Sequence, residues 1–386
     1  MVKKVKSIKN PELLTRKDNK ALWNLPKTRR YGYRNLHKIN RYGIFLRSDL
    51  VLRLKKKYKN KIGKNQLVKK MTKYKSFCSL IVGNGNNIFY EKYAKDFSKN
   101  QPQTIMSITK MLINLFVGEL VNKKNIDLNK SVSYYLPKIG SGYATAKLQD
   151  VLNMNIVNAY TEDYTKSFSS SFLHEPVGGW RIPKTGDIHL SQEKYLNTIK
   201  SIKNKNLKND SEYAFYKSAN TDVVGLIIEK VSGRPLRDWV LSAVEAAGLE
   251  DGLYIASDRF GMPWMSGGGC LITRDFLRLG LLFARKGKGV GNRKIGSPTF
   301  FNQTLRNTAP KYMSLTNNKY LYYSNSTMVS RNVIGHSGYG GQFLAVNLKT
   351  GNVAAFFSVL ETKSATKESY KVDMINMLID IVNDKY

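Results

Sequence analysis

Ser107 and Lys110 open a long apolar segment, in the stretch TIMSITKMLINLFVGEL at residues 104–120. Residues three apart share one face of a helix, so the lysine amine can reach the serine hydroxyl. A helix N-terminus and partial burial both disfavour a cation, so this amine can be neutral near pH 7 and act as a base. The stretch is also compatible with a serine that caps a buried helix and a lysine in solvent.

Ser-x-x-Lys occurs three times in the chain, but only Ser107 and Lys110 follow a predicted β-hairpin and open an apolar helix; the other two matches are Ser191–Lys194 and Ser364–Lys367. A conventional catalytic triad has little support, because no Gly-x-Ser-x-Gly elbow occurs and the histidines are isolated. The serine–lysine pair is therefore the candidate reaction centre, and the strands and helices around it must hold the two side chains together.

Strand patterns lie towards both ends of the chain and helix patterns in the middle. SFCSLIVGNGNNIFYEKYA predicts a hairpin turning at residues 84–87, and GQFLAVNLKTGNVAAFFSVLE predicts two strands turning at residues 349–352. Apolar periodicity predicts five helices. The first covers residues 108–121, the second runs from a cap at Asn220 or Thr221 to Gly233, and the third covers LRDWVLSAVEAAG. The fourth runs from a cap at Thr273 to near Gly287, and the fifth lies at the C-terminus. We expect an α+β sandwich whose sheet comes from about 76–105 and 265–386, with a helical insertion at about 125–260.

Residues 1–75 are expected to form a basic N-terminal extension to a domain at 76–386. They hold 25 Lys and Arg against three acidic residues, so they carry +22 of the net charge of +35. A lysine-rich proteome would explain this excess, and so would attraction to an anionic membrane surface or another polyanion. RLKKKYKNKIGKNQLVKK, the densest part, contains no recognisable nucleic-acid-binding motif.

Composition narrows the class of protein further. Cys78, Cys270 and four scattered histidines form neither a disulfide framework nor a metal-binding spacing, so we expect no metal and no cofactor. The sequence lacks an apolar run of membrane-spanning length and the apolar core of a secretory signal, which predicts a cytoplasmic protein, peripheral to a membrane if the basic segment binds lipid. The oligomeric state is left open.

Further motifs follow the serine–lysine pair in a fixed order. They are the hairpin before SITK, YLPKIGSGYATAKLQDVLNM, the triplet EDY, GGWR, YKSANTDVVGLIIEKVSGRP, DRFGMPWMSGGGCLITRDFLRLG and the Gly-Gly-Gln hairpin. In this series the chain resembles the serine hydrolases of the β-lactamase and penicillin-binding-protein superfamily. It is most similar to the branch of 6-aminohexanoate-dimer hydrolase and the class C β-lactamase-like esterases. The resemblance covers about 76–386, and weakly the WNLP region before it.

The resemblance implies a β-lactamase/DD-peptidase-like fold and assigns catalytic roles. Ser107 is implied as the acyl-accepting nucleophile, Lys110 as its general base and Tyr216 as a phenol that relays protons between them and the leaving group. Ser218 is implied as the motif partner of Tyr216. The sequence without this resemblance is also compatible with a structural role for Tyr216, as a half-buried aromatic residue beside the start of a helix.

His336-Ser337-Gly338 takes the place of the family's Lys-Thr-Gly element, which implies substrate-binding roles for His336 and Gly338. The backbone N–H of Tyr339, with that of Ser107, is implied as the oxyanion hole. Because a histidine is mostly neutral at pH 7, a penicillin-like carboxylate loses its usual partner and we do not expect true β-lactamase activity. His336 can equally be a packed neighbour of the site.

Tyr164 of EDY matches a tyrosine that contacts the substrate amide in the 6-aminohexanoate-dimer hydrolase branch. It favours amide over ester cleavage slightly. Trp180 and Asn220 also match family positions, but core packing and helix capping explain them as well. The expected function is hydrolysis of a small ester or linear amide through an acyl-enzyme. The rival interpretations are a binding or regulatory protein of the same fold, and a polyanion- or membrane-associated factor that acts through the basic arm.

Overall fold

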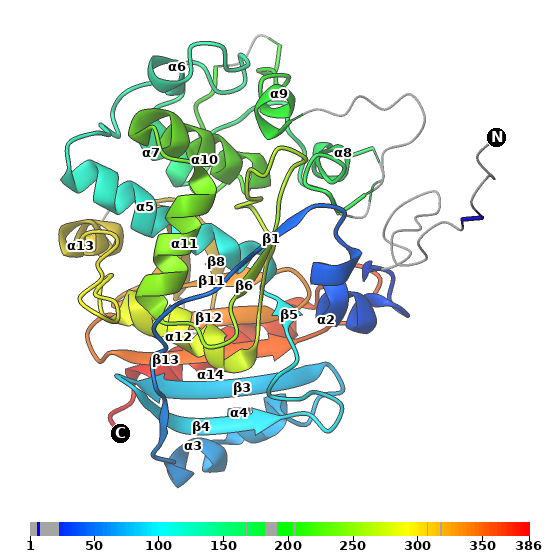
Figure 1. Ribbon diagram of the computed structural model, residues 1–386, viewed down its shortest axis with the longest axis vertical. Helices are drawn as coiled ribbons and strands as arrows, with labels where there is room; N and C mark the ends of the chain where they lie inside the picture. The colour runs from blue at the N-terminus through cyan, green and yellow to red at the C-terminus, as the bar shows by residue number, and fades with distance from the viewer. Residues whose placement is uncertain are drawn as a thin grey trace.

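A nine-stranded sheet forms the base of the molecule (Figure 1). The computed structural model describes residues 6–7, 23–164, 166, 168–181, 191–203, 206–306, 308–316 and 319–386. Within them the strand order is β2-β4-β3-β13-β12-β11-β10-β9-β8, antiparallel except for the pair β2–β4. The strands are β2 (Lys55–Lys56), β3 (Phe77–Asn84), β4 (Asn87–Tyr93), β8 (Lys311–Ser314), β9 (Tyr320–Ser324), β10 (Thr327–Ser330), β11 (Val333–Gly338), β12 (Gln342–Asn347) and β13 (Asn352–Ser358).

The two predicted hairpins form the centre of this sheet. β3 and β4 are joined at Gly85 and Asn86, and Gly85 has a φ of 61°, which glycine adopts without steric cost. β13 pairs with β3, with Ala354 opposite Val82, and so joins segments from the two ends of the chain. The sheet built from both ends is therefore a direct consequence of this one strand pairing.

Helices cover both faces of the sheet. α12 (Thr273–Ala284) packs on one face with Ile81 and Ala355, whereas α14 (Glu368–Asn383) packs on the other with Leu80 and Phe356. Side chains alternate between the two faces of a strand, and because both faces are covered, every residue of β13 is buried. α14 thereby closes the face of the sheet that is remote from α12.

The middle of the chain forms a helical layer above the sheet in Figure 1. Its long helices, α10 and α11, end at Gly233 and Gly248, both in the left-handed conformation that suits glycine at a helix C-terminus. The helices of this layer are α5 (Met111–Asn122), α6 (Val132–Tyr135), α7 (Leu148–Leu152), α8 (Ser170–His174), α9 (Gln192–Leu196), α10 (Ser218–Ser232), α11 (Leu236–Ala247) and α13 (Pro298–Arg306).

The predicted N-cap residues of α10 and α12 are wrong. The side chains that were expected to hydrogen-bond the first turn of their own helix instead bond residues elsewhere in the chain. α10 begins at Ser218, so Asn220 lies inside the helix, where its Oδ1 accepts a hydrogen bond from Tyr143 Oη at 2.9 Å. Thr273 is the first residue of α12, and its hydroxyl bonds Ser79 Oγ at 2.8 Å. A buried polar partner outweighs a local cap at both positions.

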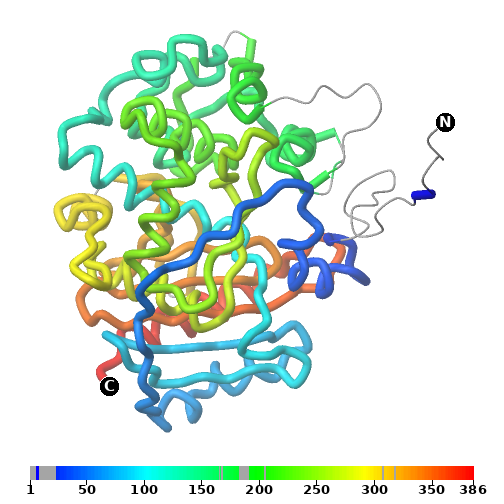
Figure 2. The backbone as a smooth tube through the Cα atoms, in the orientation of Figure 1, coloured from blue at the N-terminus to red at the C-terminus, as the bar shows by residue number. Residues whose placement is uncertain are grey.

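The basic N-terminal segment contributes to both sheets from Trp23 onward. Trp23, Tyr33 and Leu36 are buried around α2 (Arg29–Ile39), and β2 extends the large sheet beside β4. β1 pairs with β6 in a second sheet of order β1-β6-β7-β5, whose strands are β1 (Gly43–Leu46), β5 (Gln103–Thr104), β6 (Leu253–Ala256) and β7 (Gly269–Leu271). Figure 2 shows the segment after α2 running along the outside to α3 (Asn60–Lys64) and α4 (Gln66–Met71). The predicted basic extension also includes residues 1–5 and 8–22, which lie outside the described residues.

The buried Arg29 ties α2 to the chain that follows the last strand. Its guanidinium donates to the carbonyls of Leu360 and Thr362, both at 2.6 Å, and to Asn24. Leu360 lines a cavity that Ser107 also lines, so Arg29 helps to hold one wall of that cavity in place. Within the described part of the chain, no helix is both long and apolar enough to span a bilayer.

Candidate active site

Ser107 lies on a short 3-10 helix, η2 (Met106–Lys110), between β5 and α5. The chain enters it through Met106, whose φ of 50° is uncommon for a residue with a side chain. Thr104 Oγ1 accepts a hydrogen bond from the N–H of Met106 at 3.1 Å and so supports this turn. The turn leaves Ser107 half-buried at the wall of a cavity, with Lys110 one turn further on.

Lys110 is fully buried behind the serine. Its Nζ lies 3.2 Å from Ser107 Oγ and 3.3 Å from Ser218 Oγ, and it donates to the carbonyl of Ser266. Burial lowers the pKa of Lys110 to about 8, although the charges of Glu162 and Asp222 act in the opposite direction. A substantial fraction of the amine is therefore neutral near pH 7–8 and can take the proton of Ser107.

Tyr216 stands beside the same amine. Lys110 Nζ lies 5.1 Å from the centroid of its ring, and Tyr216 lines the cavity with Ser107. Its buried hydroxyl has no hydrogen-bond partner among the described residues. Burial holds the pKa of Tyr216 well above that of a free phenol, so the residue is a neutral proton donor at pH 7. Such an unpaired hydroxyl is suited to a group that arrives with the substrate.

Ser218 links Lys110 to a carboxylate that sequence reasoning missed. Glu162 accepts hydrogen bonds from the N–H of Ser218 at 2.8 Å and from its Oγ at 2.6 Å, and also from Tyr164 Oη. Glu162 is the first residue of the EDY triplet, but we expected a role only for the tyrosine. The sequence gives no sign that this irregular loop faces the start of α10, 56 residues further on.

Gly338 permits the close approach of β11 to η2. A Cβ at this position would lie 2.5 Å from the carbonyl oxygen of Ile105 and 3.2 Å from Met106 Cβ. The next residue, Tyr339, lines the cavity beside Ser107, and its ring lies 4.8 Å from that of Tyr164. The structure thus brings Ser107, Tyr339 and Tyr164 together at the cavity. The oxyanion-hole role of the backbone N–H groups of Ser107 and Tyr339 stays a prediction.

His336, by contrast, is not among the described residues that line the cavity. Its side chain is fully buried, with Nε2 3.0 Å from Tyr323 Oη and Nδ1 2.7 Å from the carbonyl of Ser337. Burial, together with the charge of Lys110, lowers the pKa of His336 to about 3. The residue is therefore neutral and packed beside the site, and a substrate-binding role for it stays a prediction.

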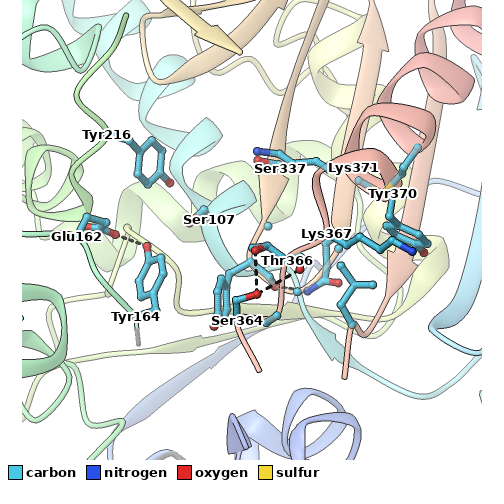
Figure 3. A pocket seen from close by; sticks show the side chains of 18 of the residues that line it. Ser107, Glu162, Tyr164, Tyr216, Ser337, Ser364, Thr366, Lys367, Tyr370 and Lys371 are labelled. Atoms are coloured by element: carbon cyan, nitrogen blue, oxygen red, sulfur yellow. Dashed lines mark hydrogen bonds between the residues drawn. The ribbon is translucent and has the colours of Figure 1, made fainter. Parts of the chain in front are cut away.

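The cavity at Ser107 has a volume of about 330 Å³, which lies at the lower end of the range for small-ligand sites. Figure 3 shows Glu162 and Tyr164 at one side of it, Lys367 and Lys371 at the other and Ser107 between them. A second space of about 40 Å³ reaches Ser107 from the side of Trp180, which packs against Trp23 and Trp264. Among the described residues, no group of three or more His, Cys, Asp or Glu side chains is arranged to hold a metal ion.

The activity should depend on pH through Lys110. If the neutral amine of Lys110 is the base for Ser107, as the resemblance implies, kcat/KM should rise as pH increases through about 8. Removing the charge in Glu162→Gln removes an interaction that raises the pKa of Lys110, so the midpoint should move down by about one pH unit.

Asp163→Asn is the matched control, because Asp163 lines the same cavity and pairs with Lys166 at 3.3 Å. Profiles of kcat/KM from pH 5.5 to 9.5 on a small ester provide the measurement. An unchanged midpoint in Glu162→Gln, or an equal shift in Asp163→Asn, would contradict the assignment.

Comparison with known proteins places these residues in a family. The beta-lactamase family matches residues 78–373. The 6-aminohexanoate-dimer hydrolase of Paenarthrobacter ureafaciens is 29% identical over 222 residues, which is 56% of this chain and 54% of the relative. The match thus spans about half the length of that curated relative.

Solved structures share the fold at low sequence identity. A Bacillus anthracis protein with the provisional name 6-aminohexanoate-dimer hydrolase has a TM-score of 0.74 at 18% identity, covering 92% of this chain and 94% of its own. A D-stereospecific amidohydrolase from a Streptomyces species has a TM-score of 0.54 at 16% identity, covering 78% and 92%. These likenesses confirm the fold class expected from the sequence. By fold and by family match, the chain belongs to the beta-lactamase family, within the superfamily of beta-lactamase-like serine hydrolases.

Proposed function

We propose that the protein hydrolyses a small linear amide or ester through an acyl-enzyme formed on Ser107. The observation that carries the proposal is the buried amine of Lys110, 3.2 Å from Ser107 Oγ at the wall of a cavity. A serine hydroxyl is a weak nucleophile unless an adjacent base takes its proton. Among the described residues, Lys110 lies within hydrogen-bond reach of Ser107 and can do so.

The first half of the reaction transfers the acyl group to the protein. Ser107 Oγ attacks the carbonyl carbon while its proton passes to the neutral amine of Lys110. The carbonyl oxygen becomes an oxyanion, which the N–H groups of Ser107 and Tyr339 would stabilise. When the tetrahedral intermediate collapses, the leaving amine or alcohol takes a proton from the Lys110 ammonium, relayed by the hydroxyl of Tyr216.

Water completes the turnover. It attacks the ester carbonyl of the acyl-enzyme and gives a proton to the regenerated neutral amine of Lys110. Collapse of the second intermediate releases the carboxylic acid, and Ser107 Oγ recovers its proton from Lys110. Burial of the amine serves both halves, because a pKa near the working pH lets one group act as base and then as acid.

Tyr164 supports an amide as the preferred substrate. Its hydroxyl lies at the cavity and donates to Glu162, and a phenol oxygen can also accept a hydrogen bond from an N–H group. A secondary amide offers such an N–H donor and an ester does not. The relative from Paenarthrobacter ureafaciens is named for hydrolysis of the 6-aminohexanoate dimer, which is a linear amide.

Replacing the nucleophile should abolish turnover and labelling. Ser107→Ala should reduce hydrolysis of a p-nitrophenyl ester on the order of 10⁴-fold and prevent covalent reaction with a fluorophosphonate probe. Ser364→Ala is the control, because Ser364 lines the same cavity and belongs to another Ser-x-x-Lys match. Labelling of Ser107→Ala at the wild-type rate would refute the proposed nucleophile.

Removing the phenol oxygen of Tyr164 should separate amides from esters. In Tyr164→Phe, kcat/KM for a short secondary amide should fall about tenfold, the cost of one hydrogen bond made to the reacting amide. The ester of the same acyl group, which lacks the N–H donor, should change less than twofold. Steady-state kinetics on this matched pair decide the point: equal losses for both substrates would show that Tyr164 acts only through packing.

A further inference from the structure

A strap of chain at residues 43–59 crosses the outside of the molecule between α2 and α3 (Figure 2). Exposed and partly buried side chains largely alternate along it, so residues two apart face the same way, as in a strand. The inward-facing apolar side chains that pack against the core are Ile44, Leu46, Leu52 and Leu54. The exposed odd-numbered residues from 45 onward are Phe45, Arg47, Asp49, Val51, Arg53, Lys55 and Lys57. The strap is thus anchored by its inner row and presents a mostly basic outer row.

A second basic segment, residues 285–294, lies against the strap. It holds five Lys and Arg and no acid, whereas residues 43–59 hold six Lys and Arg and one acid, Asp49. Arg293 pairs with Asp49 at 2.7 Å, and a Cβ on Gly291 would lie 2.5 Å from Leu50 Cδ1. Asp49 and Arg293 are 244 residues apart, so the fold gathers distant cations, which a lysine-rich composition does not do by itself. We call residues 43–59 and 285–294 together the basic face.

Most of the acids beside the basic face are already paired with arginines. The pairs are Asp49–Arg293 at 2.7 Å, Glu245–Arg293 at 4.0 Å, Glu250–Arg278 at 2.7 Å and Glu91–Arg274 at 2.7 Å. Asp251 lies close enough to Arg47 for the two charges to interact. Among the residues that the structure describes, Arg53, Lys55 and Lys57 are exposed and form no ion pair. Their charges are therefore available to attract an external polyanion.

Leu50 and Val51 give the basic face an apolar tip between Arg47 and Arg53. They are 45% and 47% exposed and lie at the bend of the strap. Aliphatic side chains flanked by cations suit the boundary between lipid headgroups and acyl chains, whereas sites for unpaired nucleic-acid bases offer aromatic rings for stacking. We propose that the basic face binds an anionic membrane surface, with Leu50 and Val51 inserted at that boundary. This contact goes beyond the proposed hydrolysis, since no residue of the face lines the cavity at Ser107.

The charge of the face can be tested by sedimentation of the whole chain with vesicles. Wild-type protein should bind vesicles of phosphatidylcholine and phosphatidylglycerol in equal amounts about tenfold more tightly than vesicles of phosphatidylcholine alone. The variant Arg47→Gln/Arg53→Gln/Lys55→Gln/Lys57→Gln should lose this preference. Its thermal unfolding and its hydrolysis of p-nitrophenyl acetate should match wild type, because these exposed side chains do not line the cavity at Ser107.

A control variant separates this face from the net charge of the protein. Lys124→Gln/Lys138→Gln/Lys147→Gln/Lys200→Gln removes the same charge from exposed lysines of the helical layer and should keep the preference for anionic vesicles. Equal losses in the two variants, or no preference in wild type, would overturn the proposal. Binding to a mixed-sequence oligonucleotide but not to the anionic vesicles would assign the face to nucleic acid and would also overturn it.

Insertion of the apolar tip can be followed separately with a single label, because both native cysteines, Cys78 and Cys270, are buried. A polarity-sensitive dye attached to Val51→Cys should shift its emission to the blue when anionic vesicles are added, since the side chain leaves water. The same dye on Tyr134→Cys, an exposed position of the helical layer, should not shift. An unchanged spectrum at Val51, or equal shifts at both positions, would contradict insertion of the tip.

Discussion

The burial of one amine, that of Lys110, determines how the rest of the site is built. An ammonium group removed from water is costly unless oxygens surround it. The fold supplies the hydroxyls of Ser107 and Ser218 and the carbonyl of Ser266, from three separate segments. The pKa of the amine is then lowered by its burial and partly restored by the carboxylates beyond these groups. The outcome of this balance is an amine whose pKa lies near neutral pH.

The carboxylates act on Lys110 through intermediaries. Glu162 accepts from Ser218, and Asp222 accepts from the N–H of Ser266 at 3.0 Å, so each acid orients a group that touches the amine. Burial raises the pKa of Asp222 to about 7, so its charge is only partly present at neutral pH. This arrangement keeps Lys110 from being held permanently as a cation.

Elements with strong local patterns were predictable from the sequence, and the reasons are physical. The β3–β4 hairpin, α10 and α11 have their own turn or stop signals, and the helical spacing of Ser107 and Lys110 places them together. The roles of Tyr216 and Tyr339 came from resemblance to a family and not from periodicity. The cavity that joins them with Ser107 is consistent with those roles.

Features set by tertiary contacts were not predictable. Glu162 lies on an irregular loop and accepts a hydrogen bond from Ser218, which is 56 residues further along the chain. Lys371 lines the cavity from α14, for which the sequence predicted only an amphipathic helix. The strand β1 and the helix α2 lie in a basic segment. Its many basic residues obscure the pattern of the apolar residues that pack against the domain. In each case the partner lies far along the chain, and no local pattern encodes it.

The protonation state of Lys110 is the most direct test of this account. Protein labelled with ¹³C at the ε-carbon of lysine would be titrated by NMR, with Lys110→Arg used to assign the resonance. We expect a midpoint near 8 for Lys110, against about 10.5 for exposed lysines. A midpoint for Lys110 that coincides with those of the exposed lysines would contradict it, because the amine would then be a permanent cation and not the base for Ser107.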